Sequence, residues 1–127
     1  MKIDLAVLGR QFSVHQEEYE EAALRVLRSG WYILGPELKA FEHEFAEFVG
    51  AKYCVGVNSG LDALTLALRA LEIKAGDEVI VPANTYIATV LAITSNGATP
   101  VFVEPNKYYN LDENLIEQAI TKKTKAI

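Results

Sequence analysis

Residues Asn58-Ser59-Gly60-Leu61-Asp62 have the types and the spacing to hold an anion. A short apolar run precedes them and a run with helical periodicity follows, which predicts a strand, a turn and a helix. The first amides of a helix have no partner inside it, and the helix dipole attracts negative charge. Gly60 would let an anion approach the backbone, and Ser59 would add a hydroxyl donor. A plain helix start capped by Ser59 fits the same residues, so the pattern leaves both interpretations open.

The carboxylate of Asp62 limits how this turn could bind a phosphate. Two negative charges side by side repel each other, so the side chain must point away or serve the helix dipole. The backbone amides would then do the binding. The turn is neither a Walker A loop nor a G-x-G-x-x-G dinucleotide motif, because it lacks the residues of both.

Two more groups follow predicted strands, at the edge where parallel α/β folds bind ligands. Tyr86, in the segment Pro82–Tyr86, has an aromatic face that would lie flat against a planar ligand, although a half-buried core aromatic is the alternative. Glu104 fits a helix cap, an ion pair, a site residue or solvated surface, and the sequence does not decide among them.

The remaining reactive side chains do not form a recognisable catalytic or metal-binding pattern. His15 and His43 have no second histidine or cysteine at metal-ligand spacing, and we expect both at the surface. Cys54 lies in a predicted strand, where we expect an inert core residue. We therefore predict no metal site in this chain.

Two helices are expected ahead of the first strand. Residues 1–12 resemble an extended arm, and a helix with acidic first turns follows and ends by Ser29-Gly30. Residues 31–36 form an aromatic loop. Pro36 can open a second helix, and Gly50 can close it as a left-handed cap.

After residue 50 the pattern alternates between strand and helix. Strands are expected at 53–57, 78–81 and 99–103, helices at 61–71, 85–95 and 112–121, and a further strand from 126. The helical connections are long enough for crossovers, so the strands should be parallel. Their apolar character fits a sheet covered on both faces. The predicted fold class is α/β, with two leading helices and then a parallel βαβαβα unit.

Composition narrows the function classes. The chain has 127 residues, a formal net charge of −5 and one cysteine. The acidic balance argues against nucleic acid as a partner, and no apolar run approaches the ~20 residues that span a membrane. With no internal disulfide and no signal-peptide pattern, we expect a soluble cytoplasmic protein.

The chain stops where a strand is expected to start. A parallel sheet cut at that point would have an unpaired edge, so we expect a truncated domain rather than a disordered tail.

Several segments occur together, and in order, in one known family. They are Ser29–Glu37, Phe41–Phe48, Asn58–Leu64, Gly76–Ala88, Gly97–Val101, Asn110–Asp112 and Thr121–Ile127. On these segments the chain resembles the N-terminal portion of the DegT/StrS family of nucleotide-sugar aminotransferases, which depend on pyridoxal phosphate (PLP).

The resemblance implies the fold-type I, aspartate aminotransferase-like large domain, with 1–50 as arm and helices and 51–127 as the start of the cofactor-binding domain. It implies amino transfer, usually from glutamate, to a keto nucleotide-sugar. Backbone amides of Ser59, Gly60, Leu61 and Asp62 would hold the PLP phosphate, and Tyr86 would stack on the ring. The segment 32–36 would lie near the active-site mouth. The family's homodimers imply a homo-oligomer.

The resemblance also implies what this chain lacks. The family's Schiff-base lysine and the aspartate that pairs with the pyridine nitrogen belong to positions beyond 127, so no catalytic residue is expected here and the chain alone should be inactive. Two alternatives remain open. The turn could hold a phosphorylated ligand in a non-catalytic binding module, or the chain could fold and self-associate without a function.

Overall fold

A computed structural model describes residues 5–127, which divide into two compact units that meet between Gly56 and Val57. Each unit is described by itself. Among the described residues, no helix is both long and apolar enough to cross a membrane. The predicted domains, 1–50 and 51–127, stay a prediction.

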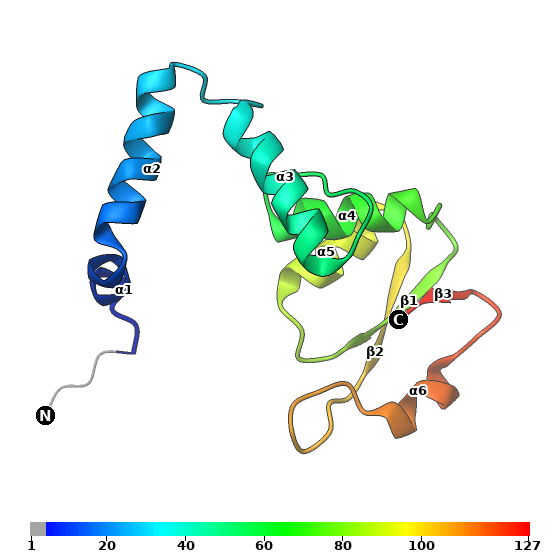
Figure 1. Cartoon of the computed structure of the whole chain (residues 1–127). Helices are drawn as coiled ribbons and strands as arrows, with labels where there is room; N and C mark the ends of the chain where they lie inside the picture. Colours follow the sequence, from blue (N-terminus) through cyan, green and yellow to red (C-terminus); the bar gives the residue numbers. More distant parts are fainter. Residues whose placement is uncertain (1–4) are drawn as a thin grey trace, which may run out of the picture. The chain divides into compact units, whose positions relative to one another are not determined.

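The first unit consists of helices: α1 (Leu8–Val14), α2 (Gln16–Ser29) and α3 (Pro36–Val49) (Figure 1). The predicted ends of α2 and α3 are confirmed. Gly30 and Gly50 follow these helices with φ of 68° and 70°, a left-handed backbone that glycine adopts without a steric penalty. Pro36 occupies the first turn of α3, where its missing amide proton is not needed.

The expected extended arm is wrong over residues 8–12, which belong to α1 (Leu8–Val14). Residues 1–4 of that arm lie outside the described part of the chain. Leu8 and Phe12 are four residues apart, on one helical face. Phe12 also stacks on Tyr19 of α2, with ring centroids 6.0 Å apart. The stacking of Phe12 on Tyr19 favours the helix, and a sequence pattern as short as seven residues does not reveal it.

The predicted strand at 53–57 is also wrong. These residues are irregular, and the side chains of Tyr53 and Val55 are each 75% exposed. The amide of Gly56 donates to Glu42 Oε1 in α3 at 2.7 Å, instead of joining a ladder. A strand needs a neighbouring strand, and none pairs with this segment within residues 5–127. Cys54 is therefore half-buried in a loop and not in a strand.

The second unit is a parallel α/β arrangement, as predicted. Its elements are α4 (Gly60–Ala70), β1 (Glu78–Pro82), α5 (Ile87–Ser95), β2 (Thr99–Val103), α6 (Glu113–Ala119) and β3 (Thr124–Ala126). The strand order is β2-β1-β3, with β1 in the centre and both pairings parallel. The strand expected from residue 126 is thus present as β3, and it begins at Thr124.

The two crossovers leave β1 and β2 in opposite directions across the sheet. Because parallel crossovers are right-handed, this places α5 and α6 on opposite faces. Figure 1 shows α4 and α5 together on one side, with α6 apart from them. The central strand is accordingly buried on both faces, and Ile80 is only 1% exposed.

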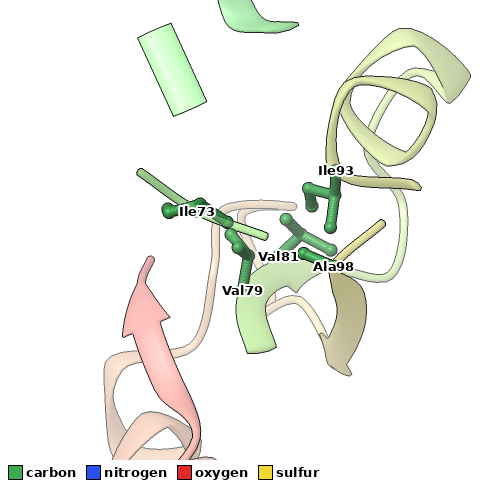
Figure 2. Packing of buried hydrophobic residues seen from close by; sticks show 5 residues of the cluster. All are labelled: Ile73, Val79, Val81, Ile93 and Ala98. Atoms are coloured by element: carbon green, nitrogen blue, oxygen red, sulfur yellow. The ribbon is translucent and has the colours of Figure 1, made fainter. Parts of the chain in front are cut away.

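The core of this unit lies between β1 and the helices α4 and α5 (Figure 2). Val79 and Val81 point to this side because alternate residues of a strand share a face. They pack with Ile73, Ile93 and Ala98, and Leu68 of α4 contacts the cluster. The cluster fixes both helices against one face of the sheet.

An ion pair joins α2 to α3 in the first unit. Arg25 donates to both carboxylate oxygens of Glu37, at 2.8 and 3.0 Å. The hydrogen bond to Arg25 lowers the pKa of Glu37 below its usual 4.5. Because the folded pKa is the lower one, the pair's contribution to stability is present above the usual value and is lost as pH falls through the lowered one.

We predict that Arg25→Met returns the pKa of Glu37 upward toward its usual value, as followed by NMR titration of the Glu37 carboxyl carbon. Arg28→Met is the matched control, because Arg28 is a neighbouring exposed arginine of the same helix. An unchanged Glu37 titration in Arg25→Met would contradict the ion pair.

Candidate functional site

The sheet determines where the candidate site forms. α4 leads into β1 through a short turn and α5 leaves β1, so both helices run antiparallel to the strand. Both therefore begin at the same edge, the carboxyl end of β1. Open parallel α/β folds bind their ligands at this edge.

An open groove of about 800 Å³ lies between the first turns of these two helices. Its lining residues are Ser59, Gly60, Leu61, Ala63 and Leu64 from the α4 side, and Tyr86, Ile87, Ala88, Thr89 and Leu91 from the α5 side. None of them carries a charged side chain. The groove therefore unites four of the five residues singled out from the sequence: Ser59, Gly60, Leu61 and Tyr86.

Asp62, the fifth, does not line the groove. Its amide instead donates to Ser59 Oγ at 3.1 Å, so Ser59 is the N-cap of α4. The Ala63 amide donates to the Ser59 carbonyl at 3.0 Å. The amides of Gly60 and Leu61 have no acceptor within residues 5–127, as expected for the first turn of a helix. The helix cap and two amide donors without an acceptor thus coexist in this turn.

Gly60 is not required by the packing of the chain. Its φ is not in the left-handed region, and a Cβ added to it would meet no atom within 4 Å. Since Gly60 also lines the groove, that Cβ would stand in open space next to the free amides. Its absence leaves room for a ligand to approach the backbone.

Tyr86 is an exposed wall of the groove, with 79% of its surface accessible. The alternative of a half-buried core aromatic is therefore wrong. The turn before it is held at both ends. Ala83 donates its amide to the Val103 carbonyl at 2.9 Å, and Thr85 donates its hydroxyl to Thr89 at 2.9 Å. The aromatic face is thus presented by a fixed turn.

The other candidates lie outside the groove lining. Glu104 is exposed, which favours the solvated-surface interpretation. His15 and His43 are exposed, as expected. The side chain of Asn84 donates to the carbonyl of Tyr109 at 3.1 Å and holds the loop after β2.

The sequence did not single out the apolar residues of the groove, such as Leu64, Ile87 and Leu91. Their three- and four-residue spacing indicates a helix face, and that signal does not distinguish a face that lines a groove from one that packs in the core.

The fold and the groove define an open parallel α/β unit that can hold an anionic, partly planar ligand. Residues 13–127 match the DegT/DnrJ/EryC1/StrS aminotransferase family, and the chain belongs to that family.

Relatives and solved structures agree. The chain is 61% identical over 114 residues to dTDP-3-amino-3,6-dideoxy-alpha-D-galactopyranose transaminase of Aneurinibacillus thermoaerophilus, over 89% of this chain and 31% of the relative. It is similar to S. venezuelae DesV, solved in complex with a ketimine intermediate, with a TM-score of 0.91 and 50% identity over 98% of this chain and 34% of DesV. It is also similar to NtdA of Bacillus subtilis, solved with the cofactor PMP, with a TM-score of 0.81 and 36% identity over 87% of this chain and 26% of NtdA.

These similarities confirm the family resemblance and the predicted fold class. The chain spans about a third of the length of the relatives it matches.

The N-cap leads to a stability prediction. Ser59→Ala should lower the free energy of unfolding by about 1 kcal/mol, because the Asp62 amide loses its acceptor. Ser59→Thr keeps a hydroxyl at the same place and should stay close to the original chain. Urea unfolding followed by circular dichroism measures both. Equal stability of Ser59→Ala and the unchanged chain would rule out the cap.

Proposed function

We propose that the groove is a PLP site and that this chain supplies the cofactor-holding part of a nucleotide-sugar aminotransferase. The observation that supports the proposal is the groove itself, whose lining includes Gly60 and Leu61 from the α4 side and the exposed Tyr86 from the α5 side. A phosphate would sit at the amides, and the cofactor ring would lie against Tyr86.

Ser59 and Asp62 complete the proposed phosphate site. The Asp62 amide is held by the Ser59 hydroxyl and becomes available when that hydroxyl turns to donate to the phosphate. The Asp62 carboxylate stays out of the site, in keeping with its absence from the groove lining and with its repulsion of phosphate.

The proposed reaction moves an amino group from an amino acid, glutamate, to the keto group of a nucleotide-linked sugar. PLP, when bound, supplies the electron sink for this chemistry. The name of the Aneurinibacillus relative, a sugar transaminase, supports the substrate class. We assign no catalytic residue in this chain and propose that the 127 residues alone do not catalyse transfer. We further propose a cytoplasmic homo-oligomer.

A second function is favoured by one observation: no lysine lines the groove. The lining therefore offers no side-chain amine that could form a Schiff base with PLP. A binding module for a phosphorylated ligand or a nucleotide-sugar, without PLP chemistry, fits that lining. Titrating the chain with PLP and with a nucleotide-sugar in parallel separates the two, because preference for the nucleotide-sugar would favour the binding module.

The phosphate contact can be tested without disturbing the fold. We predict that Gly60→Ala weakens PLP binding about tenfold or more, because its Cβ blocks the approach to charge-assisted amide donors. The variant should be at least as stable as the unchanged chain, since alanine is favoured over glycine by about 0.5–1 kcal/mol in a helix. PLP titration by absorbance, with pyridoxal as the phosphate-free control, measures the effect. Undiminished PLP affinity in a folded Gly60→Ala chain would exclude this phosphate site.

The ring contact has its own test. Tyr86→Ala should weaken PLP binding about three- to tenfold through the loss of stacking, and Tyr86→Phe should bind as the unchanged chain does. The stability of Tyr86→Ala should change little, because the side chain is exposed. Induced circular dichroism of the bound cofactor reports the ring environment. The same signal and affinity in all three chains would show that Tyr86 does not contact the ring.

A further inference from the structure

The side chain of Asn96, which follows α5 directly, connects the two helices of the groove. Its Nδ2 donates to the carbonyl of Thr65 in α4 at 3.1 Å and to the carbonyl of Ala92 in α5 at 2.9 Å. Its Oδ1 accepts from Arg69 Nε of α4 at 3.4 Å. Both amide protons of this half-buried side chain are thus directed at backbone carbonyls of different helices.

In the described part of the chain, the bonds to Thr65 and Arg69 are the polar contacts that join α4 to α5 or its cap. Apolar packing also joins the helices, because Leu68 of α4 packs against the buried cluster that includes Ile93 of α5. Apolar burial is non-directional and resists separation of two helices more than their sliding or rotation. Hydrogen bonds depend on distance and angle, so Asn96 fixes the register of the pair.

On the α5 side the connection lies far from the groove, whereas on the α4 side it reaches Thr65, directly after the lining residue Leu64. α4 and α5 begin at the same edge, and the groove occupies their first turns, while Asn96 lies after the last turn of α5. Ten residues separate Asn96 from Tyr86, which is about 15 Å along a helix at 1.5 Å per residue. A change of register at this end shifts Tyr86 relative to the amides on α4.

We propose that Asn96 is a positioning residue of the groove, which sets the distance between the phosphate-binding amides and the ring-stacking face of Tyr86. This inference rests on the proposed function in one respect: it takes PLP as the ligand that contacts both the α4 wall and the α5 wall of the groove. A ligand that touches only the α4 wall, such as inorganic phosphate, is insensitive to this distance, whereas PLP spans both walls and is sensitive to it.

Three variants separate positioning from general stability. Asn96→Asp keeps the shape but places an oxygen against the carbonyls of Thr65 and Ala92. Asn96→Ser is a second variant. Its short hydroxyl can hydrogen-bond to the end of α5 but cannot reach α4. Arg69→Gln is the control, because it removes only the long contact to Oδ1 and leaves both amide donors in place.

The experiment measures the affinities of the folded 127-residue chain for PLP and for inorganic phosphate, with a destabilised core variant, Ile93→Val, for comparison. We expect PLP binding to weaken about tenfold in Asn96→Asp and Asn96→Ser while phosphate binding stays within about twofold. Arg69→Gln and Ile93→Val should leave the ratio of the two affinities unchanged. An unchanged ratio in both Asn96 variants would overturn the proposal, whether or not stability falls.

A ligand-free readout keeps this test separate from the proposed function. If the unchanged chain binds neither PLP nor phosphate, the proposed function fails, and amide NMR spectra then decide on Asn96. Shifts in Asn96→Asp that extend to residues 59–64 and 86–91 support the positioning role. Shifts confined to residues 92–98 and to the two contacted residues of α4 contradict it.

Discussion

The second unit depends on one constraint: β1 must pair in parallel on both of its sides. β2 pairs with β1 along its whole length, from Glu78 to Pro82, and β3 pairs with its first two residues, Glu78 and Val79. Parallel pairing requires a crossover between successive strands, and each crossover returns the chain to the same end of the sheet. The helix before β1 and the helix after it must then both start at the carboxyl edge. The groove between their first turns follows from this connectivity.

The groove combines two kinds of binding surface, amide donors and an aromatic face, that a single helix start does not offer together. The open amides at Gly60 and Leu61 come from a helix start, which offers polar donors but no broad surface. Tyr86 comes from the next helix start and offers a broad face but no charge. A phosphate attached to a planar ring needs both, at a fixed separation. In the structure the spacing of the two helix starts goes with the packing of α4 against α5, to which Leu68 and Asn96 contribute.

The sequence predicted most of this fold because its signals were local. The helix ends at Gly30 and Gly50 and the strands 78–81 and 99–103 were each indicated by a few neighbouring residues. The failures were non-local. The apolar run 53–57 has the composition of a strand, but composition does not supply a partner strand, and residues 5–127 provide none.

In the candidate site, too, the local features could be predicted from the sequence and the non-local ones could not. The turn at Ser59 and Gly60 and the aromatic at Tyr86 could be chosen from residue type and from their place after apolar runs. The Asn84 and Asn96 contacts reach 25 and 31 residues along the chain, and an asparagine after a helix predicts only a stop signal. A side chain that joins two helices becomes visible only when the packing that brings them together is known.

The turn before α4 can be interpreted as a helix cap and as an anion site, and the two interpretations are compatible. In this structure Ser59 caps the helix through the Asp62 amide, which satisfies one of the first-turn donors, while Gly60 and Leu61 keep theirs open. A cap is stabilising without any ligand, so it gives no reason for the glycine that follows it. Alanine would fit position 60 without a clash and would favour the helix. Neither the backbone conformation nor the packing therefore requires glycine at position 60, which agrees with the proposal that an anion approaches a turn that is also capped by Ser59.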